Sequence, residues 1–272
     1  VPADLLAQST RRLQQLMANY EIEHGRSPEA WINKALETCT RSLQQNPNYY
    51  QTYRNLASIY ALQAQYDLSY GRASPEAINK ALEWLNKAIS SNPDDAENHH
   101  VLAEVYSLQA EMQQTQKQPA EDTLTKGLQA IQKSIFISQN DADSYLLQVH
   151  LQLLLANEQA EHGQSPLPTL QQAHGAAVRA RDVNAKSSMI YLRLGQIALA
   201  GAEWLLSHRK PADKEIIDGQ SSIDEALALN PKLALALATR GSLYLLAARS
   251  AAPGLQRRLL AEHAVFAIKQ AL

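Results

Sequence analysis

The side chains best suited to chemistry in this sequence do not form the pattern that a catalytic or metal site requires. His99 and His100 are adjacent, so on a helix they would point about 100° apart and could not easily share one ion. No Gly-rich phosphate loop, H-E-x-x-H or G-x-S-x-G motif occurs. Cys39 is the only cysteine, which excludes an internal disulfide, and it is predicted to be a small core residue. We therefore expect no enzyme activity, no metal and no cofactor.

Acidic pairs and clustered tyrosines have structural explanations. Residues 94–95, Asp141 and Asp143 begin predicted helices, where a negative charge is stabilising by tenths of a kcal/mol up to about 1 kcal/mol. The three tyrosines within residues 49–53 could stack on bases, but a net charge of −2 provides no basic groove. No apolar run approaches the roughly 20 residues that span a bilayer. Neither nucleic acid nor a membrane is expected as a partner.

The composition also suggests a location. A single cysteine suits a reducing compartment, so we expect a cytoplasmic protein. The chain starts at Val1 without an initiator methionine and stops within a repeat at Leu272, which predicts a fragment of a larger protein.

The helices that carry these side chains can be predicted from an internal repeat. The sequence INKALE at residues 32–37 returns at residues 78–83, a shift of 46 residues, and the pair Asn46-Pro47 returns at 92–93. A self-match of this period is typical of a repeat architecture. We predict a single array over 1–272 with units at about 1–46, 47–92, 93–138, 139–184, 185–230 and 231–272.

Small residues recur at fixed places in these units. Helices approach within about 8–10 Å where side chains are small, so such columns predict helix crossings. The first column is Ala57, Ala103, Val149 (an exception), Gly195 and Gly241. Two more are Ala35, Ala81, Gly127, Ala173 and Gly219, and Ser42, Ala88, Ser134, Ala180 and Ala226. Large apolar residues that open the second helix are Ile32, Ile78, Leu124, Leu170 and Ile216.

Each unit is predicted to contain two helices, A and B, so the fold is all-α with twelve helices. In the turn at residues 24–29, Gly25 suits a left-handed position after helix A, Ser27 suits a cap, and Pro28 suits the first turn of helix B. Helix A is expected at about 1–24, 47–68, 94–114, 141–160, 185–206 and from 231. Helix B is expected to end near 45 in the first unit and to span about 76–91, 120–137, 168–182 and 213–229 in the next four.

These columns, with the aromatic column Tyr53, Tyr145 and Tyr191, resemble the tetratricopeptide repeat (TPR), whose unit has about 34 residues. The aromatic column is interrupted by His99 and Leu237. The resemblance implies a right-handed α-solenoid of six helix hairpins, here with a lengthened helix A and A–B turn. The long form is similar to TPR tails of bacterial signalling proteins such as Ser/Thr protein kinases.

The resemblance also implies a concave groove, lined by helix A, that binds a peptide or protein segment. The positions that it places there are Gln51, Arg54, Asn55, Ser58, Glu97, His100, Glu104, Asp143, Leu146, His150, Met189, Leu192, Arg193, Gln196, Leu235, Ala238, Thr239 and Ser242. The carboxylate clamp of chaperone-binding members is matched only in part. We expect a protein–protein interaction module of a signalling protein, whose partner is another protein or a domain of its own parent chain.

Two other readings remain open. Twelve helices also fit a closed (α/α) toroid enzyme acting on glycans, which would require paired carboxylates and sugar-stacking aromatic residues at one rim. The array could also be a structural spacer or could self-associate through its C-terminal end.

Overall fold

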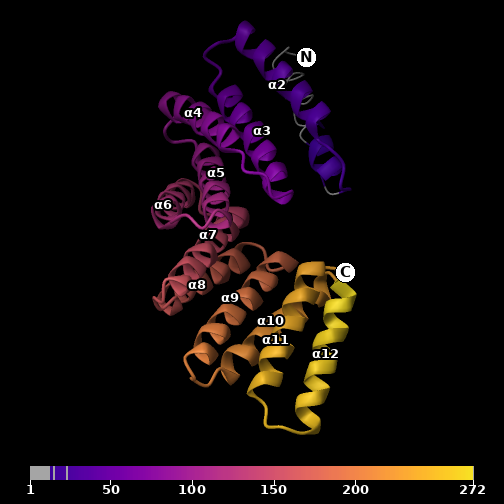
Figure 1. Ribbon diagram of the computed structural model, residues 1–272. Helices are drawn as coiled ribbons and strands as arrows, with labels where there is room; N and C mark the ends of the chain where they lie inside the picture. The colour runs from indigo at the N-terminus through magenta and orange to yellow at the C-terminus, as the bar shows by residue number, and fades with distance from the viewer. Residues whose placement is uncertain (1–12, 15, 23, 272) are drawn as a thin grey trace. The chain divides into compact units, whose positions relative to one another are not determined.

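The computed structural model describes residues 13–14, 16–22 and 24–271, and in these residues it is helical without a strand (Figure 1). Residues 13–14 and 16–22 are helical, whereas the rest of the predicted first helix, residues 1–12, lies outside the described part. The complete helices are α2 (Glu29–Gln45), α3 (Tyr50–Ser69), α4 (Pro75–Ser91), α5 (Ala96–Thr115), α6 (Glu121–Ile137), α7 (Ala142–Glu161), α8 (Leu167–Val183), α9 (Ser188–Ser207), α10 (Asp213–Leu229), α11 (Ala234–Ser250) and α12 (Leu255–Ala271).

The helix bounds repeat with the period of the sequence. Helices α3, α5, α7 and α9 have 20 residues each and begin 46 residues apart, and α4, α6, α8 and α10 have 17 residues each with the same step. The last pair departs from this rule, because α11 has 17 residues and α12 begins at Leu255 after a shorter turn. The predicted all-α class and helix pairs are confirmed.

The chain forms two compact units, residues 1–139 and 140–272, each built from packed helix hairpins. In the first unit, α3 pairs with α4 and α5 with α6, while α2 packs on α3, α4 on α5 and α3 on α5. In the second unit the hairpins are α7–α8, α9–α10 and α11–α12 (Figure 1). There α8 packs on α9 and α10 on α11, and the A helices contact each other in the order α7, α9, α11.

The repeated columns of the sequence form the cores of these units. The apolar residues that open the B helices, Ile32, Ile78, Leu124, Leu170 and Ile216, are all buried. The small columns are buried too, except for Ser42, which is half-buried and lies 3.2 Å from the hydroxyl of Thr52. The prediction that small side chains mark helix crossings is therefore supported by burial at nearly every position.

Two glycines show why these columns are small. A Cβ atom at Gly195 would lie 2.5 Å from Cδ1 of Ile223, which is fully buried in α10. A Cβ atom at Gly241 would lie 2.6 Å from Cγ1 of Ile268 in α12. Real side chains do not approach so closely, so each glycine allows helix A to contact its own helix B directly.

The turn from helix A to helix B has the same geometry in five units. The residue after the C-cap of helix A is left-handed, with φ of 68° at Gly25 and Gly71 and 73° at Gly163. Lys117 and Arg209 occupy the equivalent positions with φ of 56°, although they are not glycines. In each turn the next N–H group donates to the carbonyl five residues earlier, which satisfies the open end of helix A.

The cap predicted at Ser27 is wrong, because Pro28 occupies the N-cap of α2. Ser74 does occupy the N-cap of α4, but its side chain makes no capping hydrogen bond. The N-caps of α2 and α8 are Pro28 and Pro166. The Oγ atom of Ser27 lies 3.4 Å from the nitrogen of Glu29, one residue further from the helix than expected. The expected acidic caps are present, because Asp95 and Asp141 accept hydrogen bonds from the N–H groups of Glu97 and Asp143.

Among the described helices, none has the length and apolar character needed to cross a membrane.

Candidate functional site

The predicted groove residues of the first compact unit, which ends at Gln139, lie on α3 and α5. On α3, Gln51, Arg54 and Ser58 are half-buried. On α5, Glu97 is exposed, and His100 and Glu104 are half-buried with 3.4 Å between Nε2 of His100 and a carboxylate oxygen of Glu104. Because α3 packs on α5, these positions are on neighbouring helices.

Two of the residues assigned to the groove are engaged within the fold, Arg54 by an ion pair and Asn55 by burial. Arg54 forms an ion pair of 2.8 Å with Asp95, and both side chains are less than one-fifth exposed. Because Asp95 caps α5, this pair joins α3 to the start of the next helix A. Asn55 is 8% exposed, and its side-chain nitrogen has no hydrogen-bond partner. Neither side chain presents its polar group freely to solvent.

The adjacent histidines His99 and His100 have different partners. The Nε2 atom of His99 donates to the carbonyl oxygen of Pro93 at 2.7 Å, whereas His100 lies beside Glu104. At the ends of two A helices, His24 and His162 have a structural role, because each Nδ1 donates to the carbonyl four residues earlier at 2.8 Å. In the described part of the chain, no group of three or more His, Cys, Asp or Glu side chains could hold a metal ion.

The groove positions of the second compact unit, residues 140–272, lie on α7, α9 and α11, which contact one another in that order. Asp143 is exposed, and His150 and Gln196 are half-buried. Nη1 of Arg193 donates to Oε1 of Gln196 at 2.9 Å, so these two side chains form one polar group on α9. Leu235 on α11 is 57% exposed. We name this set the helix-A strip: Asp143, Leu146, His150, Met189, Arg193, Gln196, Leu235, Ala238 and Ser242.

Two of the expected positions are not part of this strip. Leu192 is fully buried and belongs to the core between α9, α10 and α11. Thr239 is also buried, and its hydroxyl donates to the carbonyl of Leu235 at 2.7 Å. The resemblance carries residues over by sequence position alone, and these two turn toward the neighbouring helices instead of the surface.

A cavity that the sequence did not indicate lies between α7 and α9, toward their turns. It has a volume of about 390 Å³ and is lined mainly by small and apolar residues, with Glu203, Trp204 and His208 among its polar or aromatic members. The ring centroids of Trp204 and His208 are 3.8 Å apart.

Glu203 has a clearly shifted pKa. Burial raises the pKa of its carboxyl above the ordinary value of 4.5, and the attraction of Arg249 offsets part of this effect. A carboxyl whose pKa is raised on folding is less favourable when charged, so its destabilising effect is complete above the raised pKa and absent below the ordinary one.

Because more than a third of Glu203 is exposed, solvent screens its charge, and we expect Glu203→Gln to raise the melting temperature at pH 7 only slightly. The gain should shrink as the pH is lowered toward 4.5, where Glu203 becomes neutral on its own. Thermal melts of both proteins across this pH range test the expectation. Glu225→Gln on the exposed side of α10 is the control, and an equal gain at every pH would contradict the assignment.

The comparisons with known proteins identify this fold. The structure is similar to that of TTC0263, a thermophilic TPR protein of Thermus thermophilus, with a TM-score of 0.54 and 18% identity over 88% of this chain and 100% of that chain. The fold is that of a tetratricopeptide repeat protein. No protein-family model matches the sequence. A search of curated proteins also found no match.

Two further solved structures are similar to this one. YrrB, described as a TPR protein with an unusual peptide-binding site, has a TM-score of 0.50 and 13% identity over 86% of this chain and 95% of that chain. Human IFIT1, solved as a dimer with m7Gppp-AAAA, has a TM-score of 0.54 and 16% identity over 88% of this chain and 46% of that chain. Their low identity to this chain means that they establish its TPR fold alone.

Proposed function

We propose that this TPR chain is a non-catalytic protein–protein interaction module that binds a peptide or protein segment on the faces of its A helices. The shared fold with YrrB, a protein with a peptide-binding site, supports this class of function. The observation that carries the proposal is the helix-A strip of the second compact unit, residues 140–272. Three helices in contact present exposed or half-buried polar and apolar side chains at equivalent positions.

The composition of the strip suggests how a segment would bind. Asp143, His150 and Gln196 on α7 and α9 offer polar groups that can fix the register of a bound chain. Leu235 and Ala238 on α11 are exposed and apolar, and they can contribute contact area. A partner segment with one polar end and one hydrophobic end matches this order.

The wider role that we propose is a regulatory or substrate-recruiting region of a larger bacterial signalling protein. The partner would then be a protein substrate or a domain of the same parent chain, in a cytoplasmic setting. The long unit of 46 residues supports this context.

A peptide-display selection against the complete chain tests the binding site. We expect selected peptides to lose at least about tenfold in affinity to the double variant Gln196→Arg/Leu235→Asp, because it places a second cation beside Arg193 and a carboxylate at the apolar end of the strip. Arg54 is unsuitable for such a test, since its ion pair with Asp95 joins two helices.

The control is Ile217→Asp, which changes an exposed apolar residue on α10 outside the strip. Binding should survive this substitution. Peptides that bind the double variant as tightly as the original chain would remove the strip as the site, and circular dichroism would show whether the variant is folded.

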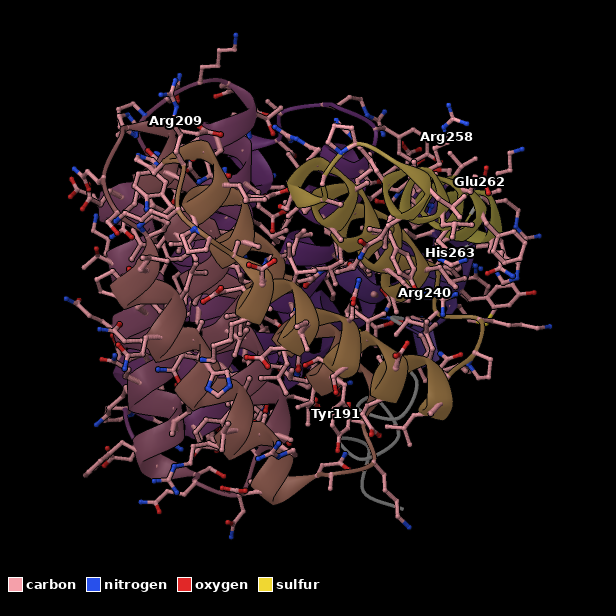
Figure 2. All side chains as sticks on the ribbon, turned by 90° about the horizontal axis from the view of Figure 1, so that it is seen from below. Tyr191, Arg209, Arg240, Arg258, Glu262 and His263 are labelled. Atoms are coloured by element: carbon pink, nitrogen blue, oxygen red, sulfur yellow. The ribbon has the colours of Figure 1, made fainter. Side chains whose placement is uncertain are left out.

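Self-association is a second proposal, supported by α12. This helix exposes Leu255, Val265 and Phe266, and a pocket of about 360 Å³ is lined by Glu262, Val265 and Phe266 among others. Figure 2 shows Glu262 on this helix. Exposed apolar groups on a terminal repeat can pack against a second copy. Sedimentation velocity should then show a mass that rises with concentration, and Phe266→Glu should reduce it. A constant monomer mass would contradict this proposal.

A further inference from the structure

An interrupted column of rings points to a separate binding site. In three units, the ring on helix A hydrogen-bonds to the carbonyl oxygen six residues earlier, in the turn before the helix. The pairs are Tyr53 with Pro47, His99 with Pro93, and Tyr191 with Ala185. Tyr145 places a fourth ring at the same position, packed against the core of its unit. The rings therefore fill the space under this turn and hold it to the helix.

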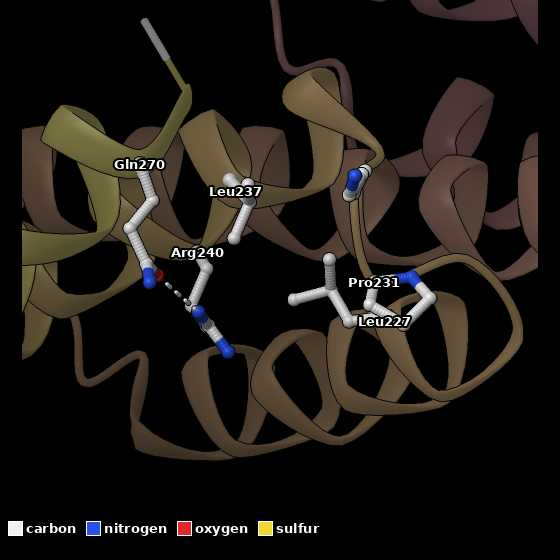
Figure 3. Close-up of a pocket in the computed structure, with 6 residues that line it drawn as sticks. Leu227, Pro231, Leu237, Arg240 and Gln270 are labelled. Carbon is white, nitrogen blue, oxygen red and sulfur yellow. Dashed lines mark hydrogen bonds between the residues drawn. The ribbon is translucent and has the colours of Figure 1, made fainter.

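The last unit lacks this ring. Leu237 takes the place of the aromatic residue, so the side chain is shorter and has no group that could donate to the turn. The equivalent carbonyl is that of Pro231, which accepts no hydrogen bond from any described residue. A cavity of about 600 Å³ is present at this position (Figure 3), a size within the range of ordinary binding pockets. Its lining residues are Leu227, Pro231, Lys232, Leu237, Arg240 and Gln270.

The charge of this pocket is positive. Lys232 and Arg240 line it, no acidic residue does, and neither cation forms an ion pair with another described residue. Nη2 of Arg240 donates to Oε1 of Gln270 at 3.3 Å, which holds the guanidinium at one side of the opening (Figure 3). Figure 2 shows the same Arg240 on the last hairpin, beside α12.

The adjacent end of α11 adds to this charge. Helices α5 and α7 have the capping carboxylates Asp95 and Asp141, whereas α3 and α9, like α11, have neither a side-chain cap nor an acidic first turn. Helix α11 begins after Leu233, which provides no side-chain cap, and its first turn contains no acidic residue. The positive end of the α11 dipole is therefore not offset locally, which favours an anion close to the pocket.

We propose that this pocket binds an aromatic side chain of a protein segment that has acidic residues next to it. The ring takes the space that tyrosine fills in the other units, between Leu227 and Leu237. A phenolic hydroxyl can donate to the carbonyl of Pro231, as those of Tyr53 and Tyr191 do to their turns. The neighbouring carboxylates face Lys232 and Arg240, where charge-assisted hydrogen bonds are strong.

This site is distinct from the helix-A strip. The two share no residue, so the failure of one does not imply the failure of the other. The proposal relies on the proposed function only in that the ligand is a segment of a protein.

The test uses the complete chain and a blocked, labelled peptide whose central tyrosine is flanked by glutamates. The peptide should bind, with an affinity at least about tenfold higher than the same peptide with alanine at the centre. Exchange of the glutamates for lysines should also weaken binding at least about tenfold, because like charges then meet at Lys232 and Arg240. No binding up to about 1 mM, or equal binding of the alanine peptide, would overturn the proposal.

The most direct test is the variant Leu237→Tyr, which places an aromatic ring at the position that holds one in the preceding four units. It should close the pocket, weaken the peptide at least about tenfold and raise the melting temperature. Unchanged binding to a folded Leu237→Tyr variant would place the peptide elsewhere and overturn the proposal. If this variant does not fold, Arg240→Gln decides, since loss of the charge should weaken the acidic peptide and leave the fold intact. His150→Ala, on the α7 part of the strip, should bind the peptide normally, because α7 does not contact α10, α11 or α12.

Discussion

Replacement of Ile216 by alanine is expected to lower the free energy of unfolding by about 2–4 kcal/mol. Ile216 is 4% exposed and lies in a core with Ala202, Ala212 and Leu246, so its truncation leaves a cavity between α9, α10 and α11. This residue opens helix B in its unit, at the position that holds Ile or Leu in each of the four preceding units. Urea unfolding followed by circular dichroism measures the loss.

The adjacent residue provides a matched control. Ile217 is 63% exposed, so Ile217→Ala removes the same atoms from a solvent-facing site. Its effect should stay within about 0.5 kcal/mol, since alanine also favours the helix slightly. Equal effects of the two substitutions would show that α10 does not present the face assigned to it.

Gly195→Val is the second substitution with a large expected effect, a loss of about 2–3 kcal/mol. A Cβ atom at this position already lies 2.5 Å from Cδ1 of Ile223, and valine adds two methyl groups to that overlap. Because Ile223 is fully buried, it has little room to move, and α9 must shift away from α10. The measurement is again urea unfolding.

Gly175 is the control for this prediction. It lies on the exposed side of α8, in the same compact unit as Gly195, and no atom is within 4 Å of its Cβ position. Gly175→Val should be neutral or stabilise by a few tenths of a kcal/mol, because glycine is unfavourable inside a helix. A second variant tests the cause: Ile223→Ala should offset part of the loss at Gly195, so that the double variant is less unstable than the sum of the two single changes.

The predicted helices agree with the structure because short-range properties decide them. The 46-residue period, the Gly turn and the column of buried openers are visible in the residues themselves. The cap predicted at Ser27 failed because cap geometry depends on how the turn leaves helix A. With Gly25 and its equivalents left-handed, the turn brings Pro28 and Pro166 to the cap in two of the units.

The candidate site was harder to predict because residue type does not show which partner a side chain has. Arg54 looks like a groove cation in the sequence, yet its charge is paired with Asp95, 41 residues later. His99 looks like a ligand, but its ring is bonded to a turn carbonyl. One signal was available for the pocket of the last unit: Leu237 breaks the aromatic column.

The sequence by itself determined the class of fold, the period and the core, since each depends on apolar and small residues recurring along one helix face. Only the tertiary structure decided what happens between helices. It buried Leu192, exposed Leu235 and left a positively charged cavity beside Leu237. The physical reason is that a cavity or an ion pair depends on the relative positions of residues far apart in the chain, and these positions are set by how the hairpins pack.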